Sequence, residues 1–498
     1  MTFPNKVYIT TSIPYVNSRP HVGHALELIQ ADVIARHHRL MGRDVWFQTG
    51  TDENAFKNVL AAHAQGLSTQ ELVTRNAAIF RSLVEKLNIS ADDFIRTTEE
   101  RHKRGVIELW NQIRPEDLYT CRYAGLYCIG CEDFYLEREL INGCCPDHGK
   151  APQAVKEENV FFRLSAYQSR LEDLISKNKI RIVPLERKKE VLNFIRNGLQ
   201  DISISRSIER SGGWGIPVPG RPNQVIYVWI DALINYISGL GFGTNDDWRK
   251  VWNSETQKIH VIGKNVWKFH AVYWPALLLS AGLPLPNEVF VHGFLTENGR
   301  KISKSLNNAI DPFEYADRFG TDGFRHFLLN AISPVEDGDF STERLASVYE
   351  SDLANGLGNL VSRVTSLCTK SGFPGLDLEP RRHSNFGDIA ELLREYRLDE
   401  AAHRIWREIA SLNQEVTRRR PWEMLKSKRI AELHEVLGRW LEGIHRIAID
   451  LGPFLPETGQ KVIDALKRPI QAAKPLFPRV EWERQPIEQH ADGHPGAA

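Results

Sequence analysis

The sequence predicts an α/β protein: a Rossmann-type parallel-sheet domain, interrupted by an inserted domain and followed by an α-helical bundle. Three observations predict this fold. The first fifty residues alternate strand, helix and strand patterns; the α/β pattern stops and later resumes; and after about residue 342 only helical periodicity is found. An interrupted α/β pattern indicates an insertion, and a long stretch without strand signals indicates a separate helical domain.

The α/β pattern begins with a predicted βαβ unit. A strand is predicted at residues 6–13, where β-branched and apolar residues predominate (KVYITTSI). Pro20 suits the first turn of a helix, and apolar residues then recur at helical spacing over 22–40. A short strand follows at 44–48. Such a unit implies a parallel sheet with a ligand at the carboxyl ends of its strands.

The α/β pattern returns in the middle of the chain. Helical patterning covers 68–114 and is followed by a cysteine-rich segment. Strand patterns then reappear at 225–230, 258–262 and 288–292, with an apolar helix over 269–281.

These patterns divide the chain into five parts. We expect the two halves of the catalytic sheet domain at 1–115 and 221–341, an inserted connective domain at 116–220, a helical domain at 342–475, and a frayed tail at 476–498.

The composition is that of an ordinary globular protein. Of 498 residues, 42% are hydrophobic and 25% are charged, which excludes a disordered or fibrous chain. The 63 Lys and Arg residues balance 63 Asp and Glu residues, so nucleic acid would have to bind to local basic patches. No apolar run reaches the ~18–20 residues of a membrane span, and no secretory signal is visible. We therefore expect no membrane partner and a cytoplasmic protein.

The cysteines are clustered. Five of the six fall in one window, at Cys121, Cys128, Cys131, Cys144 and Cys145. Cys128-x2-Cys131, followed after thirteen residues by Cys145-x2-His148, has the spacing of a zinc knuckle, although a loop of reduced cysteines is the alternative. Four protein ligands leave no open position, so we expect one structural Zn²⁺, with Cys144 able to replace Cys145.

Two histidines open the first predicted helix, in the tetrapeptide His21-Val22-Gly23-His24. His21 and His24 share one helix face, beside N–H groups that attract anions. Imidazole donors at a helix N-terminus predict a phosphate site, and Gly23 would let a ligand approach closely. The alternative is a pair of surface histidines on an amphipathic helix.

A cationic loop follows the last predicted strand. It reads Lys301-Ile302-Ser303-Lys304-Ser305 and is preceded by Gly299. Two lysines among small hydroxyl residues predict a mobile loop that contacts an anion, and a merely solvated charged loop is the alternative.

The two motifs together resemble the HIGH and KMSKS signatures of class I aminoacyl-tRNA synthetases. From residue 7 to about 425, further strings resemble the methionyl-tRNA synthetases in family order. They are SIPYVN at 12–17, GTDE at 50–53, YVWIDA at 227–232, IGK at 262–264, FHAVYWPA at 269–276, VHGFLTENGRKISKS at 291–305 and ANGLGNLVSR at 354–363.

This resemblance implies a methionine–tRNA ligase. Such an enzyme activates L-methionine with ATP and Mg²⁺ to methionyl-adenylate and pyrophosphate, and then transfers methionyl to the 3′ end of tRNA(Met), releasing AMP. Adenylation needs no protein nucleophile, because catalysis is positioning and charge stabilisation. The expected catalytic donors are His21, His24, Lys301 and Lys304, of which Lys304 is the stronger candidate for the transition-state contact. The expected ATP-binding residues are His21, Gly23, His24, Gly263, Lys264, His292, Gly293 and Lys304.

The amino-acid site is expected among aromatic residues. A thioether packs well against rings, and a Tyr hydroxyl can mark the sulfur, although an aromatic core is the alternative. Asp52 could pair with the substrate ammonium or could instead cap a helix. The expected methionine-binding residues are Ile13, Tyr15, Asp52, Trp229, Ala232, Tyr236, Phe269, His270 and Trp274.

The helical domain is expected to read the anticodon of tRNA(Met). Asn359 and Arg363 are i,i+4 on one predicted helix face, and Trp422 lies at a helix boundary within a basic stretch. These positions resemble the family's Asn-x3-Arg and Pro-Trp elements that read CAU. Alternatively, Trp422 packs in the helical core. No further domain follows, so we expect a monomer.

The chain also departs from the family. Asn54-Ala55 follows GTDE where His-Gly is frequent, and Asn265 follows IGK where Asp is frequent. These departures leave open whether the chain is a housekeeping enzyme or a specialised copy. Two other functions also stay open: an enzyme that passes an activated amino acid to a small molecule, and an inactive tRNA-binding protein.

Overall fold

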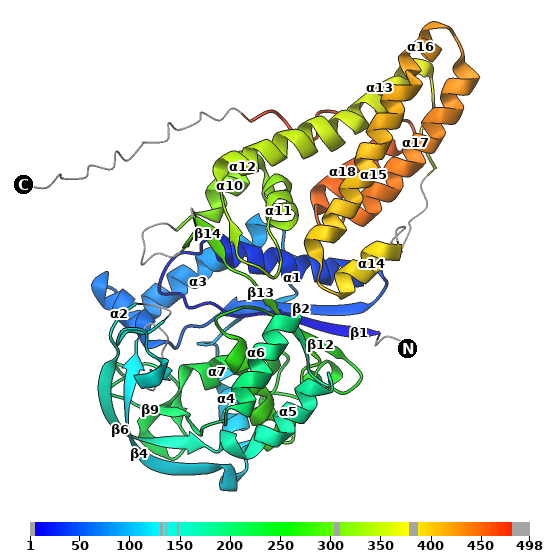
Figure 1. Ribbon diagram of the computed structural model, residues 1–498. Coiled ribbons are helices and arrows are strands. Elements are labelled where there is room, and N and C mark those ends of the chain that lie inside the picture. The colour runs from blue at the N-terminus through cyan, green and yellow to red at the C-terminus, as the bar shows by residue number, and fades with distance from the viewer. Residues whose placement is uncertain are drawn as a thin grey trace, which may run out of the picture.

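The computed structural model describes residues 5–129, 133–135, 137–146, 149–297, 299–302, 309–377 and 387–480. Its centre is a six-stranded sheet in the order β3-β2-β1-β12-β13-β7, and every neighbouring pair is parallel (Figure 1). The strands are β1 (Lys6–Thr11), β2 (Asp44–Thr51), β3 (Asp93–Arg96), β7 (Arg181–Val183), β12 (Gln257–Gly263) and β13 (Glu288–His292). The strand order reverses between β1 and β12, which confirms the predicted Rossmann-type sheet.

Both faces of the sheet are covered, because its strands alternate apolar side chains between two cores. Val7 and Ile9 of β1 point into one core and Tyr8 into the other. The first core holds α1 (Val22–Leu40), α3 (Thr69–Lys86), α10 (Pro312–Phe319) and α11 (Thr321–Asn330). The second holds α4 (Glu100–Gln112), α5 (Gln168–Ser176), α6 (Leu185–Arg196), α7 (Val228–Leu233), α8 (Asn235–Ser238), the π-helical turn η5 (Phe269–Tyr273) and α9 (Trp274–Ser280).

The insertion forms its own antiparallel sheet in the order β5-β4-β6-β8, beside the short helix α2 (Figure 1). Its strands are β4 (Leu118–Cys128), β5 (Asp133–Tyr135), β6 (Gln153–Phe162) and β8 (Ile202–Ser203), and α2 spans Phe56–Ala64. Two further small sheets are present. One is formed by β9 (Ser205–Ser207), β10 (Pro217–Val218) and β11 (Arg221–Ile226). The other is formed by β14 (Leu295–Glu297), β15 (Arg300–Lys301) and β16 (Gly338–Asp339). β7 lies within 116–220 yet pairs with β13, so part of that range belongs to the central sheet.

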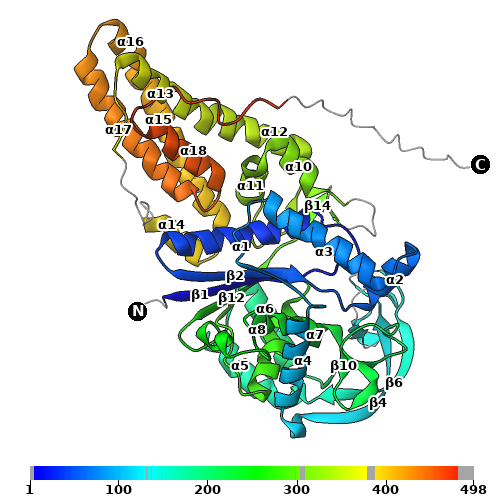
Figure 2. The same cartoon turned by 180° about the vertical axis from the view of Figure 1, so that it is seen from behind.

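After residue 341, only helices are found in the described part of the chain, as the periodicity predicts. They are α12 (Thr342–Val348), the π-helical segment η7 (Tyr349–Gly358), α13 (Asn359–Ser371), α14 (Gly387–Arg394), α15 (Leu398–Arg419), α16 (Pro421–Lys426), α17 (Ile430–Leu451) and α18 (Pro456–Leu466). This bundle extends away from the sheet, with α16 at its far end (Figure 2). One continuous core joins it to α1, since Leu26 and Leu441 belong to the same cluster of buried residues.

Two expected elements differ from the structure. The segment 68–114 contains β3 between two helices, and a strand of four residues is too short to disturb the helical pattern around it. The strand expected at 225–230 ends at Ile226, and Val228 already begins α7. α7 is buried on nearly every side, so it lacks the amphipathic pattern that marks a helix. Among the described helices, none has the length and apolar character needed to cross a membrane.

Candidate active site

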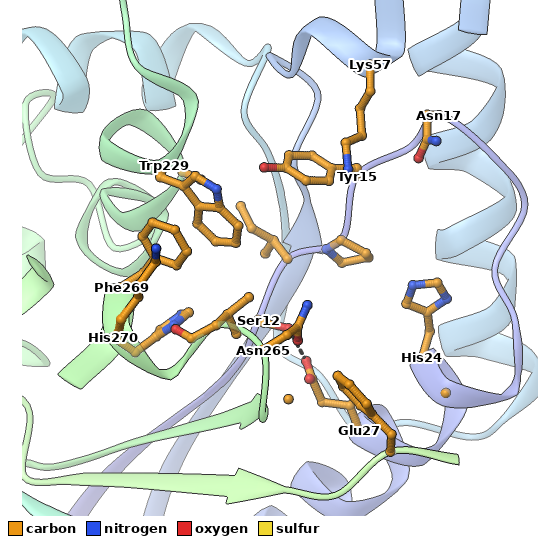
Figure 3. Close-up of a pocket in the computed structure, with 18 of the residues that line it drawn as sticks. Ser12, Tyr15, Asn17, His24, Glu27, Lys57, Trp229, Asn265, Phe269 and His270 are labelled. Atoms are coloured by element: carbon orange, nitrogen blue, oxygen red, sulfur yellow. Dashed lines mark hydrogen bonds between the residues drawn. The ribbon is translucent and has the colours of Figure 1, made fainter. Parts of the chain in front are cut away.

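A cavity of about 840 Å³ lies at the carboxyl ends of β1, β12 and β13, beside the first turn of α1. Gly263 ends β12, His292 ends β13, and both line the cavity. Ser12, which follows β1, lines it as well (Figure 3). The cavity therefore occupies the point where the strand order reverses, which is where parallel sheets bind ligands.

The two motif histidines stack at the start of α1. His21 Nδ1 accepts the Gly23 N–H, and His24 Nδ1 accepts the His21 N–H. Their ring centroids lie 3.9 Å apart. A backbone N–H can only donate, so each Nδ1 is unprotonated and each neutral ring carries its hydrogen on Nε2. Both rings are thereby fixed as hydrogen-bond donors at the cavity wall.

The helix N-terminus itself is less open than its sequence predicts. The Val22 N–H donates to Ile310 O, and the Gly23 N–H is taken by His21. A Cβ on Gly23 would lie 2.9 Å from His21 Cε1, so this glycine makes room for the capping imidazole rather than for a ligand. The backbone N–H groups of Val22 and Gly23 are therefore not open to a ligand, which leaves the imidazole N–H groups as the candidate donors of this motif.

A buried acid and imidazole form the floor beneath them. Glu27 accepts from the Ser12 hydroxyl over 2.6 Å and lies 2.8 Å from His292 Nε2. His292 Nδ1 lies 2.7 Å from Gly293 O, which only accepts, so Nδ1 carries a hydrogen. A Cβ on Gly293 would lie 2.0 Å from Glu336 O, so only glycine fits there.

Stacked aromatic rings form one wall of the cavity. Trp229 and Phe269 lie parallel with centroids 3.8 Å apart, and Tyr15 meets Trp229 edge to face at 5.9 Å. Lys57 Nζ lies 4.2 Å from the centre of the Tyr15 ring, so a cation covers the outer side of this wall (Figure 3). Ile13 and Ala232 line the same cavity.

The inner end of the cavity is polar but uncharged. His270 Nδ1 donates to Val266 O over 2.9 Å, so Nε2 accepts the Tyr236 hydroxyl over 2.6 Å. Burial lowers the pKa of His270 to about 4 and raises the pKa of Tyr236 well above its ordinary value. Both groups are therefore neutral at physiological pH, which suits an apolar side chain with one weakly polar atom.

Asp52 lies behind the cavity wall rather than in it. It forms an isolated parallel bridge with Tyr15, and Asp52 Oδ1 accepts the Asn54 N–H over 3.3 Å. The following helix is capped by Ala55, so the capping alternative for Asp52 is wrong. Asp52 is buried, and its backbone pairs with Tyr15, which lines the cavity.

Several expected site residues lie outside the described lining of this cavity. Trp274 packs in the core against Trp252 and Tyr236, as the aromatic-core alternative has it. Lys264 Nζ bonds both carboxylate oxygens of Asp337, at 2.8 and 2.6 Å. The Lys301 backbone ends β15, and Lys304 falls outside the described residues.

Sequence patterns alone do not single out many residues that line the cavity. Ser12, Glu27 and Lys57 are among them, as is Asn265, which the sequence marks only as a departure from the family. A signal existed for Glu27, because it falls on the apolar, buried side of α1 among Leu26 and Leu28. An acid on such a face indicates a partner or a ligand.

The cysteine cluster is only partly within the described residues. Cys128 ends β4 and Cys145 follows a tight hairpin, and both side chains are buried. Cys144 is half-buried and Cys121 is exposed, so burial favours Cys145 over Cys144. Cys131 and His148 lie outside the described residues. Within the part that the structure describes, no group of three or more potential ligands is found.

Of the three expected anticodon residues, the structure brings Arg363 and Trp422 together in the helical bundle. Asn359 and Arg363 share one face at the start of α13, and the Arg363 guanidinium lies 5.7 Å from the centre of the Trp422 ring. Trp422 is 43% exposed, so the alternative of a core tryptophan is wrong. An exposed tryptophan beside an arginine forms a surface on which a base can stack.

Comparisons with known proteins agree with this arrangement. The family model described as "tRNA synthetases class I (M)" matches residues 7–154 and 138–365. The methionine–tRNA ligase of Thermotoga maritima is 41% identical, covering 98% of this chain and 77% of that protein. The Brucella melitensis biotype 1 ligase is 40% identical, with 96% and 99% covered.

A solved structure agrees over nearly the whole fold. The Mycobacterium tuberculosis methionyl-tRNA synthetase in complex with methionyl-adenylate superposes with a TM-score of 0.86 at 35% identity, covering 95% of this chain and 99% of that one. The chain belongs to the class I tRNA synthetase family, among the methionyl-tRNA synthetases.

Proposed function

We propose that this enzyme is a methionine–tRNA ligase. The methionine carboxylate attacks the α-phosphorus of ATP and pyrophosphate leaves; a hydroxyl of the terminal tRNA ribose then attacks the carbonyl carbon, and AMP leaves. One observation carries the proposal. A single cavity joins fixed imidazole donors, suited to phosphate, to a neutral aromatic pocket, suited to a thioether.

The imidazole pair acts on the phosphate groups. His21 and His24 hold Nε2–H groups at the cavity wall without needing to reorganise, and this is the property that stabilises developing negative charge. Lys304, together with Lys301, supplies positive charge in the transition state. ATP is used with Mg²⁺, which neutralises the leaving pyrophosphate.

The amino acid lies between the aromatic wall and the inner polar pair. Its thioether packs against Trp229 and Phe269, and the Tyr236 hydroxyl marks the sulfur. Asp52 supplies the negative charge for the ammonium group; it directly follows β2 and lies behind the cavity wall, where its backbone pairs with Tyr15. Gly263, His292 and Gly293 border the nucleotide half of the cavity.

The inserted domain holds one structural Zn²⁺ through Cys128, Cys131, Cys145 and His148. Two described thiols support this set, because Cys128 and Cys145 are buried while the neighbouring Cys121 and Cys144 are not. A closed set of four ligands supplies fold stability rather than chemistry. Thiolate ligands also suit a reducing compartment, in agreement with a cytoplasmic enzyme.

The helical domain binds the anticodon of tRNA(Met). Trp422 stacks on a base while Asn359 and Arg363 bond its edges, which is how single-stranded bases are recognised. In this proposal the chain acts as a monomer, with catalytic halves at 1–115 and 221–341, an insertion at 116–220 whose strand β7 joins the catalytic sheet, and the reader at 342–475.

Amino-acid-dependent ATP–pyrophosphate exchange tests the activation step. The enzyme is incubated with each of the standard amino acids in turn, with labelled pyrophosphate, ATP and Mg²⁺. Exchange that depends on methionine is the expected result. Exchange with a different amino acid, or with none, would overturn the proposal.

A further inference from the structure

The loop after β2 is tied to helix α7 by a buried chain of hydrogen bonds. Asn54 Nδ2, in that loop, donates to Asp231 Oδ2 of α7 over 2.7 Å. The other carboxylate oxygen of Asp231 lies 2.6 Å from His102 Nε2 of α4. His102 Nδ1 in turn lies 2.9 Å from the Ser238 hydroxyl of α8.

The residues that form this chain of hydrogen bonds are buried. Asp231, His102 and Ser238 are inaccessible, and Asn54 is 8% exposed. The helices approach closely because α4 has Gly105 at the contact, where a Cβ would lie 2.6 Å from Ser238 Cβ. A buried carboxylate is costly without donors, so Asp231 depends on both of its neighbours.

Asn54 joins two acidic groups. Its backbone N–H donates to Asp52 Oδ1 over 3.3 Å, while its side chain donates to Asp231. The same Nδ2 contacts Thr97 O at 3.2 Å. The Asn54 amide donates these hydrogens, carries no charge and does not titrate. A carboxylate at this position would carry a negative charge and would titrate.

This chain of hydrogen bonds connects two walls of the amino-acid site. One end holds Asp52, whose backbone pairs with Tyr15. The next member, Asp231, belongs to α7, whose Trp229 and Ala232 line the cavity. A shift of α7 relative to the loop would change the distance between the group expected to bind ammonium and the wall expected to bind the thioether.

We propose that Asn54, Asp231 and His102 are positioning residues that fix the geometry of amino-acid binding. They act through Asp52 and Trp229 and do not touch the substrate themselves. The inference deepens the function proposed above and rests on it. The inference also assigns a positioning role to Asn54, which departs from the family pattern.

The Asn54→Asp variant tests the inference with almost no change in shape. It places a second carboxylate against Asp231, so the two groups repel and the donor is lost. At about pH 8, we expect the methionine KM in pyrophosphate exchange to rise about 10- to 100-fold, while the KM for ATP stays within about twofold. The methionine Kd, measured by tryptophan fluorescence, should rise in parallel.

Acidification should reverse the defect. A proton shared between the introduced carboxyl group and Asp231 replaces the lost amide hydrogen, so the KM ratio of variant to wild type should fall between about pH 8 and about pH 6. The surrounding titratable and charged groups are the same in both proteins. They are Asp52 and Glu53 of the loop, Arg96 of β3, His102 of α4 and Asp231 of α7.

A matched control and a second pair of variants complete the test. Asn413→Asp changes an amide that donates to Gly356 O in the helical bundle, and should leave the methionine KM unchanged. His102→Gln keeps a donor for Asp231 and should retain affinity, whereas His102→Leu should lose it. This second pair decides the question if N54D does not fold.

Two results would overturn the inference. One is an N54D enzyme with wild-type methionine KM at both pH values. The other is an equal loss of methionine and ATP affinity that no pH restores, which indicates a general structural defect. A wild-type enzyme without methionine-dependent exchange would overturn the proposed function as well, so the two failures are distinguishable.

Discussion

At the scale of the residue, the positions of individual hydrogen atoms determine which side chains of this site donate hydrogen bonds and which accept them. The Val266 carbonyl fixes the hydrogen of His270 on Nδ1, and this forces the Tyr236 hydroxyl to donate to Nε2. The same logic places hydrogens on Nε2 of His21 and His24. Backbone groups thus set the roles of four side chains before any substrate binds.

Replacing Tyr236 with Phe tests the inner polar pair. The change leaves His270 Nε2 without its donor and removes the hydroxyl that marks the sulfur. We expect the methionine KM to rise about 2- to 12-fold, with a smaller change for norleucine, which lacks sulfur. Pyrophosphate exchange with both amino acids measures the difference. Tyr315→Phe removes a hydroxyl that is hydrogen-bonded to Thr342, away from the cavity, and serves as the control. Equal losses for methionine and norleucine in the Tyr236→Phe enzyme would refute the assignment.

At the scale of the element, sequence periodicity correctly predicts the bounds of β13 and of the long helix α1. The strand at 288–292 matches β13, and the helix at 22–40 matches α1, with bounds unchanged. Periodicity fails for α7, because a helix buried all round resembles a strand, and for β7 and β3, because three or four residues hold too few repeats.

The residues of the site could also be predicted only in part from the sequence. Residues with distinctive chemistry, such as His21 and His24, were predictable, whereas the bonds of Asn54 to Asp231 and of Ser12 to Glu27 were not. The sequence shows which residue types are present, but such pairs depend on how α4, α7 and the loop after β2 are brought together. Trp274 illustrates the reverse case, since its ring type suits a pocket and its position in α9 places it in the core.

The inserted sheet should depend on its metal. We expect one Zn²⁺ per chain by metal analysis of freshly purified protein, and Cys128→Ser should lose it and unfold the hairpin locally. Cys121→Ser changes an exposed cysteine of the same strand and should keep the metal. Hydrogen exchange over β4 and β6 measures the local loss. Zinc retained by C128S at full occupancy would remove Cys128 from the ligand set.

In the whole molecule, the two proposed recognition sites belong to different domains. The cavity lies at the central sheet. Trp422 belongs to α16, which lies at the far end of the helical bundle (Figure 1). Trp422→Ala should raise the KM for tRNA about 5- to 150-fold, the cost of losing one base stack, and leave pyrophosphate exchange unchanged. Trp46 on β2 is similarly exposed, at 38% against 43%, so Trp46→Ala is a matched control. Unchanged charging by W422A would exclude Trp422 as the reader.

Global stability should fall in mild acid. Burial lowers the pKa values of His37 and His270 to about 4, so the unfolded chain binds protons that the folded chain refuses. The free energy of unfolding should therefore fall as pH drops from about 6.5 to about 4, by up to ~1.4 kcal/mol per pH unit for each histidine. Urea titrations at a series of pH values measure the slope. His270→Gln should flatten it; a slope unaffected by this change would contradict the assignment.

Charging of tRNA is the most direct test of the central claim, since it requires both recognition sites at once. The enzyme is given labelled methionine, ATP, Mg²⁺ and tRNA transcripts that differ only in the anticodon. We predict that methionine becomes acid-precipitable on the CAU transcript and far more slowly on the others. Methionine-dependent pyrophosphate exchange without transfer to any tRNA would contradict the account, and would identify instead an enzyme that activates methionine for another acceptor.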